Sequence, residues 1–157
     1  MNNSGLITNS NYENLKLEMS FPKSYSWDKD AEVLNEDEQV YTQNFFAGGG
    51  RYSTTADLAK FSDALFLDKS LLSELSMASL LQTYPDKNQY GYGLWVRFHD
   101  RGKQIIKAAH RPGRNMGINT MFTYVFDHDI SIIILSNTDR ISVDSLSAFI
   151  QKQILEQ

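Results

Sequence analysis

The sequence contains no cysteine, which excludes disulfide bonds, thiolate metal sites and a cysteine nucleophile. Long apolar runs are also absent. The longest, from Ile130 to Leu135, is the length of a strand and falls well short of the roughly 18 apolar residues that span a bilayer. The N-terminal residues, MNNSGLITNSNYENLK, show neither the basic nor the apolar region of a signal peptide. We therefore expect no membrane span, and the compartment stays open.

Positive charge is also in short supply. The formal net charge is −4 and the pI is near 5.3, so the chain as a whole offers no electrostatic reason to bind nucleic acid. The charges are nevertheless uneven, because residues 28–38 are mostly acidic and residues 97–114 carry six Lys or Arg side chains against Asp100 alone. The basic stretch has two interpretations: a solvated face of a strand pair, or a pocket for a substrate carboxylate.

The 157 residues are enough for one ordinary domain with a core. Residues 1–46 show no sustained period and are expected to be mostly irregular, with a short strand around Tyr25. Thr54 and Asp57 form a capping box for a helix ending near Phe66. A second helix is expected from Ser70 to Gln82.

The pattern then changes to that of strands. Strands are expected in the segments YGYGLWVRF, KQIIKAAH, NTMFTYVF and ISIIILSN. Glycines 91 and 93 mark places where the backbone must come close to something. From Ser142 onward a terminal helix is expected, whose buried face would consist of Val143, Leu146, Phe149, Ile150 and Ile154. Together these elements predict an α+β fold, an antiparallel sheet of three to four sequential strands with helices packed on it.

Residues 47–58, AGGGRYSTTADL, carry three glycines before the first helix. No Lys follows them, as a phosphate-binding P-loop would require, so they are interpreted as a tight turn. The three histidines, His99, His110 and His128, lack the spacing that places two metal ligands on one helical face. His99 and His128 fall in turn-like sequence and are expected to be solvated. His110 is the candidate functional histidine, because it ends a strand.

A serine nucleophile is less evident. Ser20 and Lys23 match the S-x-x-K motif of penicillin-interacting enzymes. However, Pro22 biases the preceding residue away from helix, so Ser20 and Lys23 would not share a helical face. Residues 12–14 match the Y-x-N motif but precede the supposed nucleophile. Both matches are interpreted as coincidental.

Four segments, in order along the chain, nevertheless match motifs that occur together in one family. Residues 49–61, GGRYSTTADLAKF, match GG-x-Y-S-T-x-x-D-L-A-x-F, and residues 90–95 match Y-G-x-G-x-W. His110 and Gly113 fall where a K-T-G or H-x-G motif opens the strand that lines the active site. The later matches are Gly117, to a glycine of that strand, and residues 130–137, to V-V-V-L-x-N. In these segments the chain resembles the serine β-lactamase-related proteins, which include class C β-lactamases, D-alanyl-D-alanine peptidases, D-aminopeptidases and esterases.

The resemblance implies acyl transfer on a small amide or ester substrate, such as a β-lactam or peptide, without cofactor or metal. It places His110, Gly113, Arg111 and Arg114 in the substrate pocket, with an arginine pairing a substrate carboxylate. The sequence departs from the H-x-G pattern, because the glycine follows His110 by three residues with Pro112 between.

Residues 1–5 resemble a mid-domain segment of the family, L-G-M-x-x-T-G. The chain would then begin halfway through the family fold, without the nucleophile, and have little turnover alone. Residues 1–46 would lie against a partner, and residues 47–157 would form the C-terminal portion. The partner would be a polypeptide that supplies the missing part, or a second copy of this chain. Family members commonly act outside the cytoplasm. Two alternatives remain: an oligomeric, non-catalytic module that binds a partner or ligand, and an unrelated structural domain.

Overall fold

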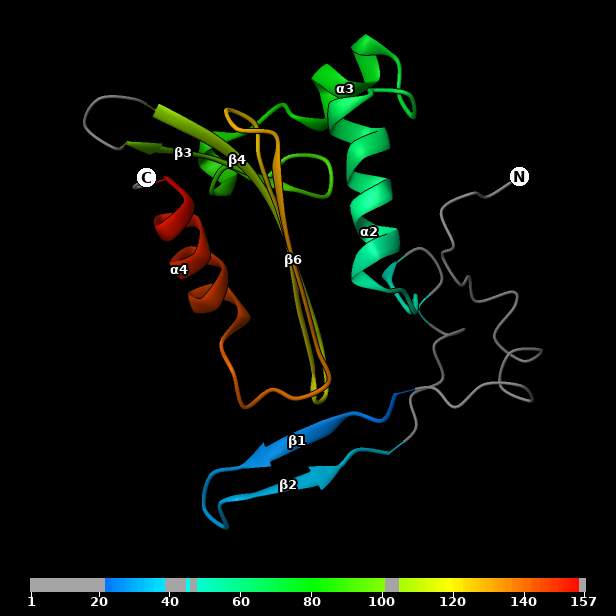
Figure 1. Ribbon diagram of the computed structural model, residues 1–157, viewed down its shortest axis with the longest axis vertical. Helices are drawn as coiled ribbons and strands as arrows, with labels where there is room; N and C mark the ends of the chain where they lie inside the picture. Colours follow the sequence, from blue (N-terminus) through cyan, green and yellow to red (C-terminus); the bar gives the residue numbers. More distant parts are fainter. Residues whose placement is uncertain (1–21, 39–44, 46–47, 101–104, 156–157) are drawn as a thin grey trace, which may run out of the picture.

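The computed structural model describes residues 22–38, 45, 48–100 and 105–155. Its centre is a four-stranded antiparallel sheet in which strands consecutive in sequence are also neighbours in space (Figure 1). The strands are β3 (Trp95–Asp100), β4 (Ile105–Asn115), β5 (Ile118–Val125) and β6 (Ile130–Ser136). The predicted α+β class, with a sequential antiparallel sheet and helices packed on it, is confirmed.

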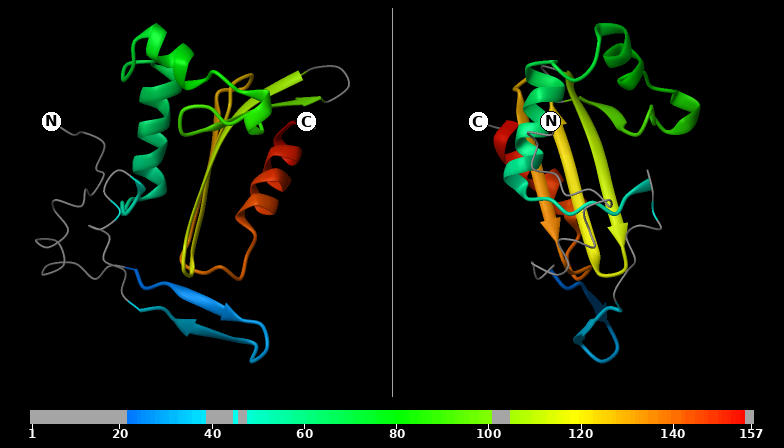
Figure 2. Two further views of the ribbon diagram at one scale, coloured as in Figure 1. Left: turned by 180° about the vertical axis from the view of Figure 1, so that it is seen from behind. Right: turned by 90° about the vertical axis from the view of Figure 1, so that its right-hand side faces the viewer.

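Two helices, α2 (Thr55–Ser62) and α4 (Val143–Leu155), lie on opposite faces of this sheet (Figures 1 and 2). The α2 helix begins where the sequence predicts, because the side chain of Thr54 accepts a hydrogen bond from the Asp57 N–H at 3.1 Å. It continues through a wider turn, η3 (Asp63–Leu67), to the expected end near Phe66. In the glycine stretch before it, Gly50 has a φ of 75°, a backbone conformation that favours glycine.

The face of the sheet covered by α2 holds an apolar core. Phe66 stacks on Tyr124 of β5 with ring centroids 4.6 Å apart, and Val96 and Ala109 beside them are fully buried. The Tyr124 hydroxyl donates to Asp129 at 2.8 Å, which satisfies the polar end of the buried ring. This core depends on strand alternation, which directs every second side chain of β3, β4 and β5 toward α2.

The face covered by α4 differs from the prediction. Val143, Ser147 and Gln151 are the buried residues of α4, whereas Leu146 and Phe149 are 40% and 60% exposed. The buried residues recur every four positions, so they form one helical stripe toward the sheet. The prediction is right for Val143 and wrong for Leu146 and Phe149, because the buried stripe of α4 meets the polar residues Thr123 and His110 of the sheet.

Two local predictions need correction. The third helix, α3 (Glu74–Leu80), is shorter than expected, because Ser73 caps it by accepting a hydrogen bond from the Ser76 N–H. A short 3-10 turn, η4 (Pro85–Lys87), follows it. β3 begins at Trp95 and not at residue 90. Gly91 does make a close approach, since a Cβ there would lie 2.3 Å from the Gln82 carbonyl oxygen.

Near the N-terminus of the described chain, β1 (Tyr25–Asp28) and β2 (Val33–Glu36) form an antiparallel hairpin. The strand expected around Tyr25 is thus confirmed, whereas β2 was not predicted. The Tyr25 N–H donates to the Asn137 carbonyl at 2.9 Å, just beyond β6. The Gly117 N–H donates to the Asp37 carboxylate at 2.9 Å. The hairpin is therefore fastened to the end of the sheet where β6 ends and β4 turns into β5 (Figure 2).

Candidate functional site

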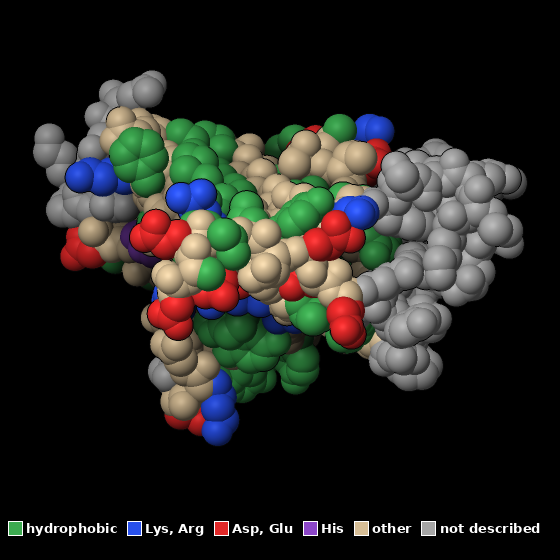
Figure 3. Space-filling model, turned by 90° about the horizontal axis from the view of Figure 1, so that it is seen from below, with side chains coloured by type: hydrophobic (Ala, Val, Ile, Leu, Met, Phe, Trp, Pro, Cys, Tyr) green, Lys and Arg blue, Asp and Glu red, His purple; other side chains and the backbone are tan. Residues whose placement is uncertain are grey.

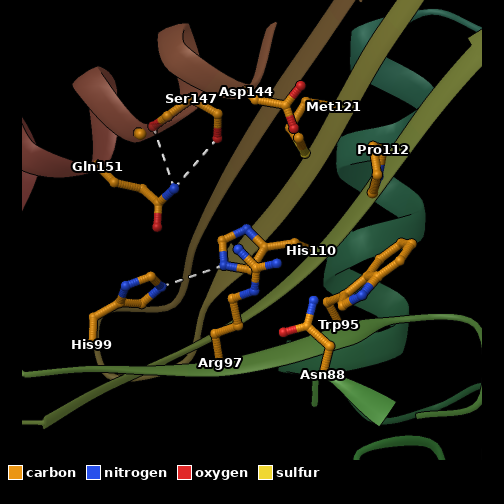
Figure 4. Close-up of a pocket in the computed structure, with 11 residues that line it drawn as sticks. Asn88, Trp95, Arg97, His99, His110, Pro112, Met121, Asp144, Ser147 and Gln151 are labelled. Atoms are coloured by element: carbon orange, nitrogen blue, oxygen red, sulfur yellow. Dashed lines mark hydrogen bonds between the residues drawn. The ribbon is translucent and has the colours of Figure 1, made fainter. Parts of the chain in front are cut away.

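A cavity of about 310 Å³ lies between the sheet and α4 (Figure 4). The strands contribute side chains that point to the same face, since alternate residues of a strand share a face. The α4 helix contributes four residues, of which Ser147 and Gln151 belong to its buried stripe. The lining residues are Asn88, Trp95, Arg97, His99, His110, Pro112, Met121, Asp144, Ser147, Ala148 and Gln151.

His110, the predicted functional histidine, stands at the centre of this cavity (Figure 4). Its Nδ1 atom lies 3.1 Å from the Thr123 hydroxyl of β5, directly opposite in the strand register. The Thr123 hydroxyl lies 3.1 Å from the Ser147 hydroxyl of α4, and both residues are almost fully buried. The Gln151 amide N–H₂ group also donates to Ser147, to its carbonyl oxygen at 3.3 Å. A buried polar network therefore fixes one edge of the His110 ring.

His99 was expected in a solvated turn, and that prediction is wrong. The residue lies in β3 opposite Ile106, half-buried, on the same face of the sheet as His110. The two Nε2 atoms are 3.5 Å apart, and the rings are nearly perpendicular, with an interplanar angle of 81°. The two imidazoles thus face each other across the cavity (Figure 4). His128, by contrast, lies exposed in the β5–β6 turn as expected.

Burial, together with the smaller effects of the neighbouring His99 and Arg97, lowers the pKa of His110 to about 4. Removal from water penalises the imidazolium form, and a nearby arginine charge repels the added proton. His110 is therefore neutral at neutral pH. A general base works best when its pKa lies near the working pH, so His110 is better suited to hydrogen bonding or ligation than to proton abstraction.

The two predicted arginines, Arg111 and Arg114, contact different parts of the structure. Arg111 lies next to His110 in sequence and so points to the opposite face of β4, where its guanidinium donates to the Tyr90 hydroxyl at 3.3 Å. Arg114 forms an ion pair with Asp144 in the first turn of α4. The arginine that lines the cavity with His110 is Arg97, which lies two residues before His99 on β3.

Gly113 and Pro112 lie in the part of β4 that extends beyond β3. In the register, β4 pairs with β3 only up to His110, whereas its pairing with β5 continues to Asn115. Pro112 can occupy this strand because no β3 partner needs its missing N–H. Gly113 lies opposite Thr120, whose hydroxyl donates to the Gly113 carbonyl at 3.3 Å. Gly113 is therefore not among the residues that line the cavity.

The S-x-x-K match receives no support from the described residues. Lys23 is exposed and forms an ion pair with Glu36 at 2.8 Å, whereas Ser20 and the Y-x-N match at 12–14 lie outside the described residues. The sequence reasoning did not identify His99, Arg97, Ser147 and Gln151. Alternation along β3 is the signal that could have found the first two, and the four-residue spacing on α4 could have found the others.

Comparisons with protein-family models, with curated proteins and with solved structures returned no match to this chain. Among the described helices, none has the length and apolar character to cross a membrane. In the same part of the chain, no three or more His, Asp or Glu residues are grouped so that they could hold a metal ion.

Proposed function

We propose that the chain forms the sheet portion of a serine hydrolase related to the β-lactamases and penicillin-binding proteins, acting on an amide or ester. The observation that supports this proposal most directly is the order of the helices and strands along the chain. The matched motifs lie on α2, just before β3, on β4 and on β6. These strands belong to one sequential antiparallel sheet, and α2 packs on it. In this proposal the acylated serine lies outside this sequence, in a further segment of the protein or in another polypeptide.

His110 would then serve as a neutral imidazole that hydrogen-bonds substrate, because its pKa of about 4 makes it a weak base at neutral pH. Arg97 takes over the role that the sequence gave to Arg111 and Arg114, since it lines the cavity while those two contact Tyr90 and Asp144. A guanidinium at this position would pair with a substrate carboxylate.

Two measurements on the purified chain test the proposal. Nuclear magnetic resonance during titration with a penicillin should shift the His110 ring signals and leave those of His128 in place. Intact-mass spectrometry after incubation with the same penicillin, and separately with an activated ester, should show no covalent adduct. The proposal would be overturned if the penicillin neither shifted the His110 signals nor formed an adduct. An adduct mapped to Ser20 and lost in Ser20→Ala would overturn the external nucleophile but keep the hydrolase.

A second candidate is a non-catalytic module that functions as an oligomer. It is favoured by the apolar side chains that the outer side of α4 leaves exposed, Leu146 and Phe149. Hydrophobic side chains are also visible among charged ones on the surface seen from below (Figure 3). The occupant of the α4 surface would be a second copy of this chain.

A further inference from the structure

The distance between His99 and His110 is unusual for a hydrogen bond. Their Nε2 atoms are 3.5 Å apart, whereas nitrogen donors usually lie about 2.9–3.0 Å from their acceptors. Two histidine nitrogens bound to one tetrahedral zinc ion, each about 2.0–2.1 Å from it, lie about 3.4 Å apart. The observed distance is therefore closer to that of two ligands of one ion than to that of a normal hydrogen bond.

We propose that His99 and His110 bind one divalent transition-metal ion of the zinc type through their Nε2 atoms, in the cavity between β3, β4 and α4. The proposal requires neither the family membership nor acyl transfer. It does bear on them, because an ion on His110 would occupy the nitrogen that the hydrolase proposal gives to substrate.

The surroundings of His110 suit a ligand. Metal-binding histidines usually form a hydrogen bond through their second ring nitrogen, which fixes the orientation of the ring. The Nδ1 atom of His110 has such a partner in Thr123, which is held in turn by Ser147. Both partners are buried polar residues at a helix–sheet interface, where apolar side chains would normally pack.

The remaining coordination positions face the cavity. The described residues offer no third His, Asp or Glu beside the pair. Figure 4 shows instead the side-chain oxygen of Gln151 pointing toward the two imidazoles, while its nitrogen donates to Ser147. An ion here would be bound by two imidazoles, with the amide oxygen and water in the other positions. Zinc sites with open positions of this kind leave room for a further ligand.

The charge around the histidine pair also affects metal binding. Arg97 lines the same cavity, and its positive charge repels a cation. Removal of that charge should therefore strengthen metal binding. The test then includes one variant that is expected to bind more tightly, whereas the histidine variants are expected to bind more weakly.

Isothermal titration calorimetry of the metal-free chain with Zn²⁺ tests the proposal. We expect one ion per chain, with affinity reduced roughly tenfold or more in His99→Ala and in His110→Ala. His128→Ala is the matched control, because it removes an exposed histidine far along the chain from the pair, and it should bind as the wild type does. Arg97→Gln should bind more tightly than the wild type.

The proposal is overturned if the wild type does not bind zinc, or if His99→Ala binds as well as the wild type. Loss of binding in His128→Ala with retention in the other variants would equally overturn it. Circular dichroism and thermal melting show whether each variant is folded. If His110→Ala fails to fold, the zinc affinity of His99→Ala tests the proposal instead. Zinc-dependent shifts of the His99 and His110 ring signals in nuclear magnetic resonance spectra of the wild type provide the second measurement.

Discussion

At the scale of single residues, Gly117 shows how a residue without a side chain lets two parts of the molecule come close together. It lies in the turn between β4 and β5, where its N–H donates to Asp37. A Cβ at this position would lie 2.3 Å from the carbonyl carbon of Tyr25 in β1. That contact is with backbone, which cannot rotate away as a side chain can, so any larger residue must displace the hairpin.

We therefore expect Gly117→Ala to lower the free energy of unfolding by about 1–3 kcal/mol. Urea denaturation measures the change. Gly49→Ala is the matched control, because a Cβ there would meet nothing within 4 Å, and it should leave the stability unchanged or raise it slightly. Equal effects of the two substitutions would show that the close approach at Gly117 carries no energetic weight.

At the scale of elements, the β1–β2 hairpin is joined to the sheet by polar contacts. The side chain of Ser26 donates to one oxygen of Asp37, and the Gly117 N–H donates to the other. The Trp27 N–H donates to Asp139 at 2.7 Å, beyond the end of β6. Asp37 is thus the carboxylate through which the segment after β2 contacts the β4–β5 turn.

This arrangement makes the stability of the protein depend on the pH in a defined way. Partial burial raises the pKa of Asp37, but the hydrogen bonds it accepts outweigh burial and bring the pKa below its ordinary value. The unfolded chain therefore binds the proton at a higher pH than the folded chain. The stabilisation by Asp37 is present above about pH 4, and it is lost as the pH falls through the folded pKa.

Thermal melting of the wild type and of Asp37→Asn across the acidic range checks this expectation. The variant should melt at a lower temperature near neutral pH, and the difference should shrink as the pH falls below about 4. Glu36→Gln is the control, because its carboxylate pairs with the exposed Lys23 and surface ion pairs contribute little. A difference independent of pH would contradict the assignment to the ionised Asp37.

At the scale of the whole molecule, the sheet is covered on both faces, but α4 carries apolar side chains on its outer side as well. Leu146 and Phe149 are exposed there, while Val143 on the inner side is fully buried. A helix with apolar residues on both sides has a second surface to cover. Self-association through that surface is what the second functional candidate requires.

The double variant Leu146→Ser, Phe149→Ser should convert an associated wild type to monomer, without a lower melting temperature. Size-exclusion chromatography with light scattering measures the mass. Leu75→Ser is the matched control, because Leu75 is a leucine on α3 with 82% exposure, and it should leave the mass unchanged. A monomeric wild type at high protein concentration would reject this candidate.

Much of the fold follows from local sequence. The capping residues Thr54 and Asp57 place the start of α2, and the apolar run from Ile130 places β6. The turns between strands are short, so sequential pairing follows once the strands are recognised. His110 was identified as the candidate site residue from a local signal, the end of a predicted strand. That signal was wrong about the strand, because β4 continues past His110 to Asn115.

The composition of the cavity required tertiary structure. Whether a strand side chain points toward α2 or α4 depends on which helix covers which face, and that separates His110 from its neighbour Arg111. His99 was assigned to a turn because HDRG is turn-like sequence, yet His99 belongs to β3, where it pairs with Ile106. The buried stripe of α4 is partly polar for the same reason: Ser147 and Gln151 face inward because the sheet presents Thr123 and His110 to them. Local periodicity identifies elements, whereas long-range packing determines which side chains meet.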